Sequence, residues 1–162
     1  MKLIIARHGE AENRSQTGLD KDRSLTNKGK ADIIKMANFL RNTNIKITKI
    51  FHSSYLRTTE TASIYADRFD NNIELNPEFA LTPEGNFTEI IPVLQKFNNS
   101  DGILLVSHNP GVAYFASRLI HAETLAPSLP FSPGTALALN IPKERFTKGQ
   151  LVWMLSPDDI SC

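Results

Sequence analysis

Short apolar runs alternate with longer amphipathic stretches along most of this chain. The runs Leu3–Ala6 and Ile103–Val106 are apolar throughout, which is typical of strands buried on both faces of a sheet. Two shorter strands are predicted at Lys49–Phe51 and at Ile73–Leu75, the latter just before Pro77. The hydrophobic pattern therefore predicts several short, buried strands separated by long connections.

Apolar residues at helical spacing predict a helix in each long connection. Thr26 is a suitable N-cap for a first helix of about sixteen residues, which Asn42-Thr43-Asn44 ends. Pro92 should kink the third helix or delay its start. Asn109 and Pro110 suit the N-cap and the first position of the fourth. The apolar stripes are Ile33, Ala37, Leu40; Ala62, Tyr65, Ala66, Phe69; Phe87, Ile90, Ile91, Leu94; and Val112, Phe115, Ala116, Leu119.

Two strand-like segments near the end of the chain, Thr135–Ile141 and Leu151–Leu155, are joined by the charged connection Lys143 to Gln150. We predict that they pair as antiparallel strands. Loops are predicted where the chain is polar or rich in proline and glycine. These segments are Glu10–Ser24, Ala80–Gly85 and Ala122–Gly134.

The resulting order alternates strands with helices and ends in two strands. Such alternation favours an α/β fold of three layers, with a mostly parallel sheet between helices and an antiparallel edge. The sequence contains no internal repeat and no composition shift that would mark a domain boundary. Residues 1–162 are therefore expected to form one domain.

Composition narrows the class of protein further. The chain has 18 Lys and Arg against 17 Asp and Glu, and its net charge of +1 does not call for a nucleic acid or an anionic membrane as partner. The single cysteine, Cys162, supports neither a disulfide framework nor a thiolate metal site. The apolar start is too short for a signal peptide, and no later stretch reaches membrane-spanning length. We expect a soluble cytoplasmic protein.

Two of the predicted strands end in turns that carry histidine, Arg7-His8-Gly9 and Ser107-His108-Asn109-Pro110. A third strand ends near Ser53-Ser54, with Arg57 one helical turn further on. If these strands are parallel neighbours, both histidines and both arginines lie at one edge of the sheet, where ligands bind in open α/β folds. Guanidinium groups and a helix N-terminus bind oxyanions, and a glycine lets a ligand approach the backbone. This combination predicts a phosphate pocket.

These motifs resemble those of the histidine phosphatase superfamily, which includes phosphoglycerate mutases and acid phosphatases. The short length and two later segments are similar to one small branch, the SixA-type phosphohistidine phosphatases. The resemblance runs over nearly the whole chain. The matching segments are Arg7-His8-Gly9, Arg23-x-Leu25-Thr26-x-x-Gly29, Ser53-Ser54-x-x-Arg57 followed by Thr61-Ala62, Leu81-Thr82-Pro83-x-Gly85, Ser107-His108 and Trp153-x-x-Ser156-Pro157.

The resemblance implies a phosphoglycerate-mutase-like fold and a role for each of four site residues. His8 would attack phosphorus and be phosphorylated transiently, while Arg7, Arg57 and His108 would bind the phosphoryl oxygens. No metal or other cofactor is implied. The partner would be a histidine-phosphorylated protein, either a histidine-containing phosphotransfer domain or a phosphocarrier, and the chain is expected to be a monomer.

The chain departs from the family pattern in two respects. Ser54, Thr58 and Glu60 stand where the family commonly has proline, alanine and glutamine, although all three only flank the motif. Larger members also use a carboxylic acid to protonate the leaving alcohol, and no residue matches that acid by position. Glu84 and Glu78 lie in or near the right loop, but a surface carboxylate is the simpler interpretation of each.

Physical chemistry supports the implied mechanism. Neighbouring guanidinium groups disfavour a protonated imidazole and should keep His8 neutral, with its other ring nitrogen donating to a carbonyl. A phosphohistidine substrate demands less acid catalysis than a phosphate ester. No long insertion is present to form a lid, so the pocket should be open enough for a phosphohistidine on a protein surface to reach it. His52, His121 and Trp153 are interpreted as structural or surface residues.

The sequence therefore predicts a phosphohistidine phosphatase, with two alternatives. One is a phosphatase of small phosphate esters, whose turnover would depend on Glu84 or Glu78. The other is a phosphohistidine-binding module without catalytic activity, which would have no need of the nucleophile.

Overall fold

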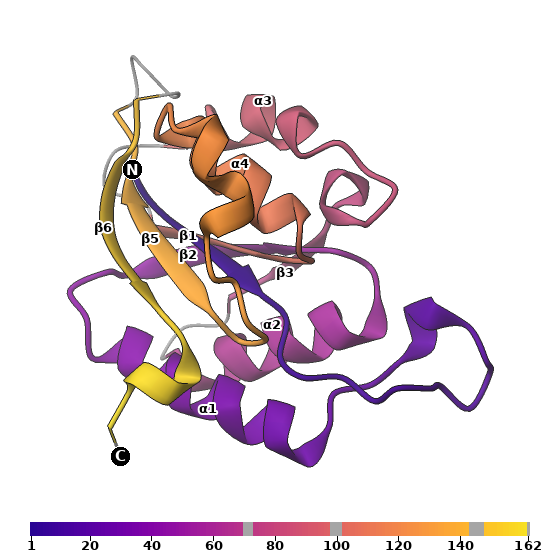
Figure 1. Cartoon of the computed structure of the whole chain (residues 1–162). Coiled ribbons are helices and arrows are strands. Elements are labelled where there is room, and N and C mark those ends of the chain that lie inside the picture. Colours follow the sequence, from indigo (N-terminus) through magenta and orange to yellow (C-terminus); the bar gives the residue numbers. More distant parts are fainter. Residues whose placement is uncertain (70–72, 98–101, 143–147, 162) are drawn as a thin grey trace.

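A six-stranded sheet lies between two layers of helices in the computed structural model, which describes residues 1–69, 73–97, 102–142 and 148–161 (Figure 1). The strand order is β3-β2-β4-β1-β5-β6. In chain order the strands are β1 (Lys2–Arg7), β2 (Ile47–His52), β3 (Leu75–Pro77), β4 (Gly102–Ser107), β5 (Ala136–Asn140) and β6 (Gln150–Leu155).

Strands β3, β2, β4 and β1 are parallel, whereas β5 and β6 continue the sheet in antiparallel pairing. The prediction of a mostly parallel sheet with an antiparallel edge is confirmed. Arg7 at the end of β1 pairs with Ser107 at the end of β4, and His52 at the end of β2 pairs with Val106. The carboxyl ends of these three neighbouring strands therefore meet at one edge, where ligands bind in such sheets.

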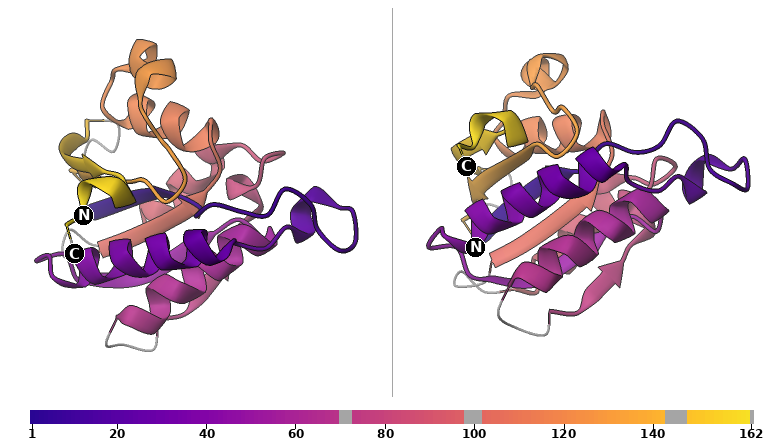
Figure 2. Two further views of the ribbon diagram at one scale, coloured as in Figure 1. Left: turned by 60° about the horizontal axis from the view of Figure 1, so that its bottom comes forward. Right: turned by 90° about the horizontal axis from the view of Figure 1, so that it is seen from below.

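Helices cover both faces of the sheet. The helices α1 (Asn27–Arg41) and α2 (Leu56–Arg68) lie side by side on one face, and α4 (Gly111–Leu119) lies on the other (Figure 2). The short α3 (Ile91–Leu94) packs on the α4 face, and Pro92 delays its start as predicted, because the preceding Phe87–Ile90 is a 3-10 helix. Within the described ranges, no helix is long and apolar enough to cross a membrane.

Alternation along β1 divides the core between the two faces. Leu3 and Ile5 pack in the cluster beneath α4, whereas Ile4 and Ala6 pack in the cluster beneath α1 and α2. Successive strand side chains point to opposite faces, so a continuous apolar run is required when both faces are covered. Trp153 of β6 packs edge to face on Phe39, which confirms its predicted packing role.

The start of α1 was predicted correctly, but the start of α4 was not. The Thr26 hydroxyl accepts a hydrogen bond from the Gly29 N–H at 2.9 Å, and the helix has fifteen residues. In α4 the first helical residue is Gly111, and the position before it is taken by Pro110, whose carbonyl accepts from the Tyr114 N–H. Asn109 therefore lies one residue too early to cap the helix, and the Asn109–Pro110 peptide bond is cis.

Further boundaries differ from the sequence-based expectations. The third strand is Leu75–Pro77 rather than Ile73–Leu75, because parallel pairing aligns Ile50 with Leu75 and His52 with Pro77. Pro77 is tolerated there since β3 is an edge strand. The predicted antiparallel pair of β5 and β6 is confirmed.

The three predicted loops are not wholly irregular, since each contains or borders a short 3-10 helix. These are η1 (Asp20–Asp22), η2 (Phe79–Leu81) and η4 (Glu123–Ser128). Most of the charged connection from Lys143, and also Cys162, lie outside the described residues.

The segment that leaves β1 is fixed by close backbone contact with α1. A Cβ atom at Gly29 would lie 2.1 Å from the Glu10 carbonyl oxygen, and one at Gly9 would lie 2.9 Å from the Gly29 oxygen. The Thr26 N–H donates to the same Glu10 carbonyl at 2.9 Å. Only glycine permits this approach, which holds the turn carrying His8 against the helix start.

Candidate functional site

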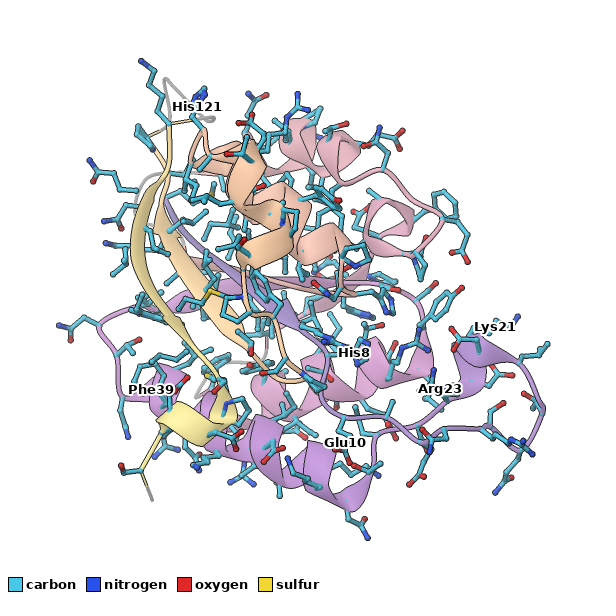
Figure 3. All side chains as sticks on the ribbon, in the orientation of Figure 1. His8, Glu10, Lys21, Arg23, Phe39 and His121 are labelled. Carbon is cyan, nitrogen blue, oxygen red and sulfur yellow. The ribbon has the colours of Figure 1, made fainter. Side chains whose placement is uncertain are left out.

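The residues singled out from the sequence come together at the carboxyl edge of the sheet. His8 follows β1, His108 follows β4, and Arg57 lies in the first turn of α2, directly after β2. All three line a cavity of about 370 Å³, together with Asp20, Thr82 and Phe87. Figure 3 shows His8 at the end of β1, with Arg23 on the loop that runs beyond it.

The His8 imidazole is buried and held in one orientation. Its Nδ1 lies 2.7 Å from the Gly9 carbonyl oxygen, which can only accept, so Nδ1 donates and Nε2 keeps its lone pair. The Nε–H of Arg57 donates to this Nε2 at 3.3 Å. The pKa of His8 is lowered to about 4, mainly by burial; the Gly9 hydrogen bond opposes this shift, and the nearby charges of Arg57 and Arg7 add to it. His8 is therefore a neutral nucleophile at pH 7.

The low pKa of His8 predicts a titration that can be measured. In the folded chain the His8 resonances should titrate with a midpoint near pH 4, instead of the ordinary 6.5 found after denaturation. Between these values the unfolded chain binds a proton that the folded chain does not. The free energy of unfolding should therefore fall as the pH is lowered from about 6.5 towards 4, by about 3 kcal/mol for His8 alone. NMR titration and urea unfolding at several pH values test this, and a native midpoint near 6.5 would contradict it.

His108 lies edge to face with His8, and the two ring centroids are 5.1 Å apart. Its Nε2 is 2.9 Å from the Ser53 hydroxyl. Its Nδ1 is buried and has no hydrogen-bond partner within the described part of the chain. Burial, followed by the charges of the histidine and arginine neighbours, lowers the pKa of His108 to about 3. The ring is therefore neutral and carries one buried nitrogen that has no partner among the described residues.

Arg57 is buried, and some of the N–H donors of its guanidinium are paired with Asp20. Its Nη2 lies 2.9 Å from Asp20 Oδ2, and its Nη1 donates to the Asp20 main-chain oxygen at 2.8 Å. Asp20 is also paired with Arg23, and these two arginines hold the pKa of the carboxyl below its usual range. The Tyr55 ring lies 4.9 Å from the Arg57 guanidinium carbon and 5.1 Å from the His108 ring.

Arg7 stands slightly apart from the cavity. Its Nη1 donates to the Phe131 carbonyl at 2.6 Å, and its Nε is buried with no partner among the described residues. Two buried polar atoms, Arg7 Nε and His108 Nδ1, are thus unpaired at the same sheet edge. Buried polar groups are almost always paired, so each of these two atoms is a candidate partner for a bound ligand.

A family model for the histidine phosphatase superfamily (branch 1) matches residues 3–89, which is more than half of the chain. The chain belongs to the histidine phosphatase superfamily. The match includes the turn with His8 and the start of α2 with Arg57, whereas His108 lies beyond it.

Similarity to individual histidine phosphatases extends over nearly the whole chain. The phosphohistidine phosphatase SixA of Escherichia coli (strain K12) is 29% identical over 161 residues, which cover 97% of this chain and 94% of that protein. A solved structure of the protein histidine phosphatase SixA complexed with tungstate has a TM-score of 0.86 at 26% identity and covers 98% of both chains. The alpha-ribazole phosphatase from Shigella flexneri, at 16% identity and a TM-score of 0.74 over 100% of this chain and 99% of its own, shares the fold. The predicted phosphoglycerate-mutase-like architecture is confirmed.

Neither glutamate considered as an acid lies in the cavity of this histidine phosphatase. Glu84 is exposed, and its Oε1 accepts a hydrogen bond from the Tyr55 hydroxyl at 2.5 Å. That bond is the main cause of the lowered pKa of Glu84, so the group is ionised at neutral pH. Glu78 is half-buried and lies just before η2. The geometry does not prepare either carboxyl to donate a proton.

The three departures from the family pattern flank the site without entering it. The Thr58 hydroxyl donates to the Ser53 carbonyl at 2.7 Å. Glu60 accepts from the Leu25 N–H at 2.6 Å and so ties α2 to the start of α1. Ser54 lines a groove beside the loop of residues 12–24. Two of the three residues, Thr58 and Glu60, thus make local hydrogen bonds that stabilise the segments beside the site.

The other histidines lie outside the cavity. His52 is buried, and its Nδ1 donates to the Ser53 carbonyl at 2.8 Å, whereas His121 is exposed at the end of α4. Sequence reasoning missed Asp20 and Tyr55. Nothing in the sequence separates Asp20 from the other acidic residues of its loop, and only its position three residues before Arg23 could have drawn attention to it.

Proposed function

We propose that this histidine phosphatase hydrolyses phosphohistidine on a partner protein through a phospho-His8 intermediate. The observation that carries the proposal is the neutral His8 ring at the cavity: its Nδ1 donates to the Gly9 carbonyl, so Nε2 keeps its lone pair, beside Arg57 Nε at 3.3 Å. Nε2 attacks phosphorus, and the N–P bond to the partner's imidazole breaks. That ring leaves neutral when its other nitrogen carries a proton. Water then attacks phospho-His8, which releases inorganic phosphate and restores the neutral imidazole.

Arg7, Arg57 and His108 are proposed to bind the phosphoryl oxygens. In phosphoryl transfer the protein contributes mainly positioning and positive charge around those oxygens. Two buried nitrogens without partners in the described residues, Arg7 Nε and His108 Nδ1, support this assignment. It also agrees with the binding of tungstate, a tetrahedral oxyanion, by the SixA structure that this chain resembles.

The choice of phosphohistidine rests on the leaving group. A neutral imidazole departs without an enzymic acid, and among the residues that the structure describes the cavity contains no carboxyl other than Asp20, whose pKa is lowered. The similarity to SixA over 97% of the chain supports the same choice. The proposed partner is a histidine-containing phosphotransfer domain or a phosphocarrier protein, and the proposed catalytic domain is the whole of residues 1–162.

Substrate preference tests this proposal directly. The chain is incubated with a histidine-phosphorylated phosphocarrier protein and, separately, with an aryl phosphate, and phosphate release is followed. We expect kcat/KM for the phosphoprotein to exceed that for the aryl ester by about a hundredfold or more, because phosphohistidine releases a neutral imidazole, whereas the aryl ester must release an anionic aryloxide without help from a proton donor. Preference for the aryl ester would favour a small-molecule phosphatase. Tight binding of the phosphoprotein without phosphate release would favour a binding module.

Glu84→Gln and Glu78→Gln are predicted to retain phosphohistidine hydrolysis within about threefold of the parent rate. A general acid contributes about 10²- to 10⁴-fold, so a loss of that size in either variant would identify the acid and contradict the mechanism. Glu89→Gln is a matched control, since Glu89 lies in the neighbouring 3-10 helix and is exposed. The rates are compared at neutral pH, where Glu84 is ionised in the parent chain.

A further inference from the structure

The Ser53 hydroxyl is fully buried at the end of β2 and lies beside the proposed phosphate site. A hydroxyl has one proton to donate and two lone pairs that can accept. The Tyr55 N–H donates to Ser53 Oγ at 3.3 Å, which uses one lone pair. The other contact of Ser53 Oγ within the described residues is His108 Nε2 at 2.9 Å. A buried hydroxyl proton therefore has one available acceptor, the ring nitrogen of His108.

We infer that Ser53 donates its proton to His108 Nε2 and so holds His108 in the tautomer that is protonated at Nδ1. A neutral imidazole carries its hydrogen on one nitrogen only, and the hydrogen bond made by the other nitrogen decides which. Burial keeps His108 neutral over the physiological range. With Nε2 accepting, the hydrogen resides on Nδ1, the buried atom that has no partner in the described structure.

This tautomer decides whether His108 can bind an oxyanion. A phosphoryl oxygen is an acceptor, so it is attracted by an Nδ1–H and repelled by an Nδ1 lone pair. The inference rests on the proposed function to the extent that the ligand at His108 is a phosphoryl oxygen. Ser53 then acts as a positioning residue, because it acts on the phosphoryl group only through His108.

The surroundings hold both partners in place. The Ser53 N–H donates to the Val106 carbonyl at 3.1 Å, which ties the serine to β4, the strand that leads to His108. The His108 ring is flanked edge to face by His8 and Tyr55, at centroid distances of 5.1 Å each. These contacts place the hydroxyl and the ring within hydrogen-bond distance of each other.

The tautomer can be measured without any turnover, by ¹⁵N NMR of the histidine side chains of the full chain at pH 7. We expect His108 to show a protonated Nδ1 and an unprotonated Nε2, and Ser53→Ala to shift this distribution towards protonated Nε2. A parent spectrum with protonated Nε2, or an unchanged distribution in Ser53→Ala, would overturn the inference. If Ser53→Ala does not fold, the parent spectrum alone decides. A correct tautomer in a chain that releases no phosphate from phosphohistidine would leave this inference standing and refute only the proposed function.

Inhibition by tungstate gives a second measurement. Loss of the directing hydrogen bond should raise the tungstate inhibition constant about tenfold in Ser53→Ala, and Ser53→Thr should restore part of the affinity. Ser117→Ala is the matched control, since Ser117 is equally buried but donates to the Tyr114 carbonyl within α4. Equal inhibition of Ser53→Ala and Ser117→Ala would contradict a role for Ser53 at His108.

Discussion

Replacement of His8 by alanine is expected to abolish phosphate release from a histidine-phosphorylated protein, with a loss of at least about 10⁴-fold. We do not expect His108, the other histidine that lines the cavity, to replace His8 as nucleophile, because its Nε2 is engaged by the Ser53 hydroxyl. In the parent chain, labelled phosphate should appear on His8 after rapid quenching under alkaline conditions. Single-turnover measurements with a labelled phosphoprotein give both the rate and the intermediate.

The matched control for this variant is His121→Ala, since His121 is exposed and lies outside the cavity. Circular dichroism and the unfolding midpoint show whether His8→Ala keeps the fold, because His8 is itself buried. Release by His8→Ala at the parent rate, with the fold intact, would refute a covalent mechanism at this residue.

Arg57→Ala should lower kcat/KM by about 10³- to 10⁵-fold, which is the range found when an arginine that stabilises phosphoryl transfer is removed. Its guanidinium is buried beside the nucleophile, with Nε at 3.3 Å from His8 Nε2. Arg57→Lys should recover only a small part of the loss, because an ammonium group cannot present several donors in a plane. Steady-state kinetics with the phosphoprotein measure both variants.

Arg68→Ala provides the comparison within the same helix. Arg68 is the last residue of α2 and lies far along the chain from the first turn that carries Arg57. We expect its kinetics to match those of the parent chain. A loss below about tenfold in Arg57→Ala would show that the guanidinium is not required for the transition state, and would leave Arg7 and His108 to hold the phosphoryl group.

The sequence was sufficient to predict that His8, Arg57 and His108 lie together. Each follows a strand, and parallel neighbouring strands bring their carboxyl ends to one edge whatever the details of the loops. The burial of both strand faces was equally predictable from the uninterrupted apolar runs. The positions of the motifs after strands and the apolar runs were informative because parallel strand pairing and burial of both sheet faces follow from them directly.

Other features depend on contacts between distant segments. Asp20 contacts Arg57 only because its loop folds back over the start of α2. The course of this loop could not be predicted from the residues near Asp20 in the sequence. The start of α4 was misplaced by one residue because Asn109 and Pro110 suit a helix start in more than one alignment. The register of β3 follows from its pairing with β2, which periodicity over so few residues cannot specify.

The ion pair between Asp20 and Arg57 has a consequence for the product. Phosphate that leaves phospho-His8 is still an anion, and a fully exposed pair of arginines would retain it. Because the Asp20 carboxylate is already paired with one edge of the Arg57 guanidinium, it competes with the departing phosphate for the donors of that arginine. The loop that carries Asp20 would in this way help to empty the site after each cycle, so that turnover is less limited by how slowly the product dissociates.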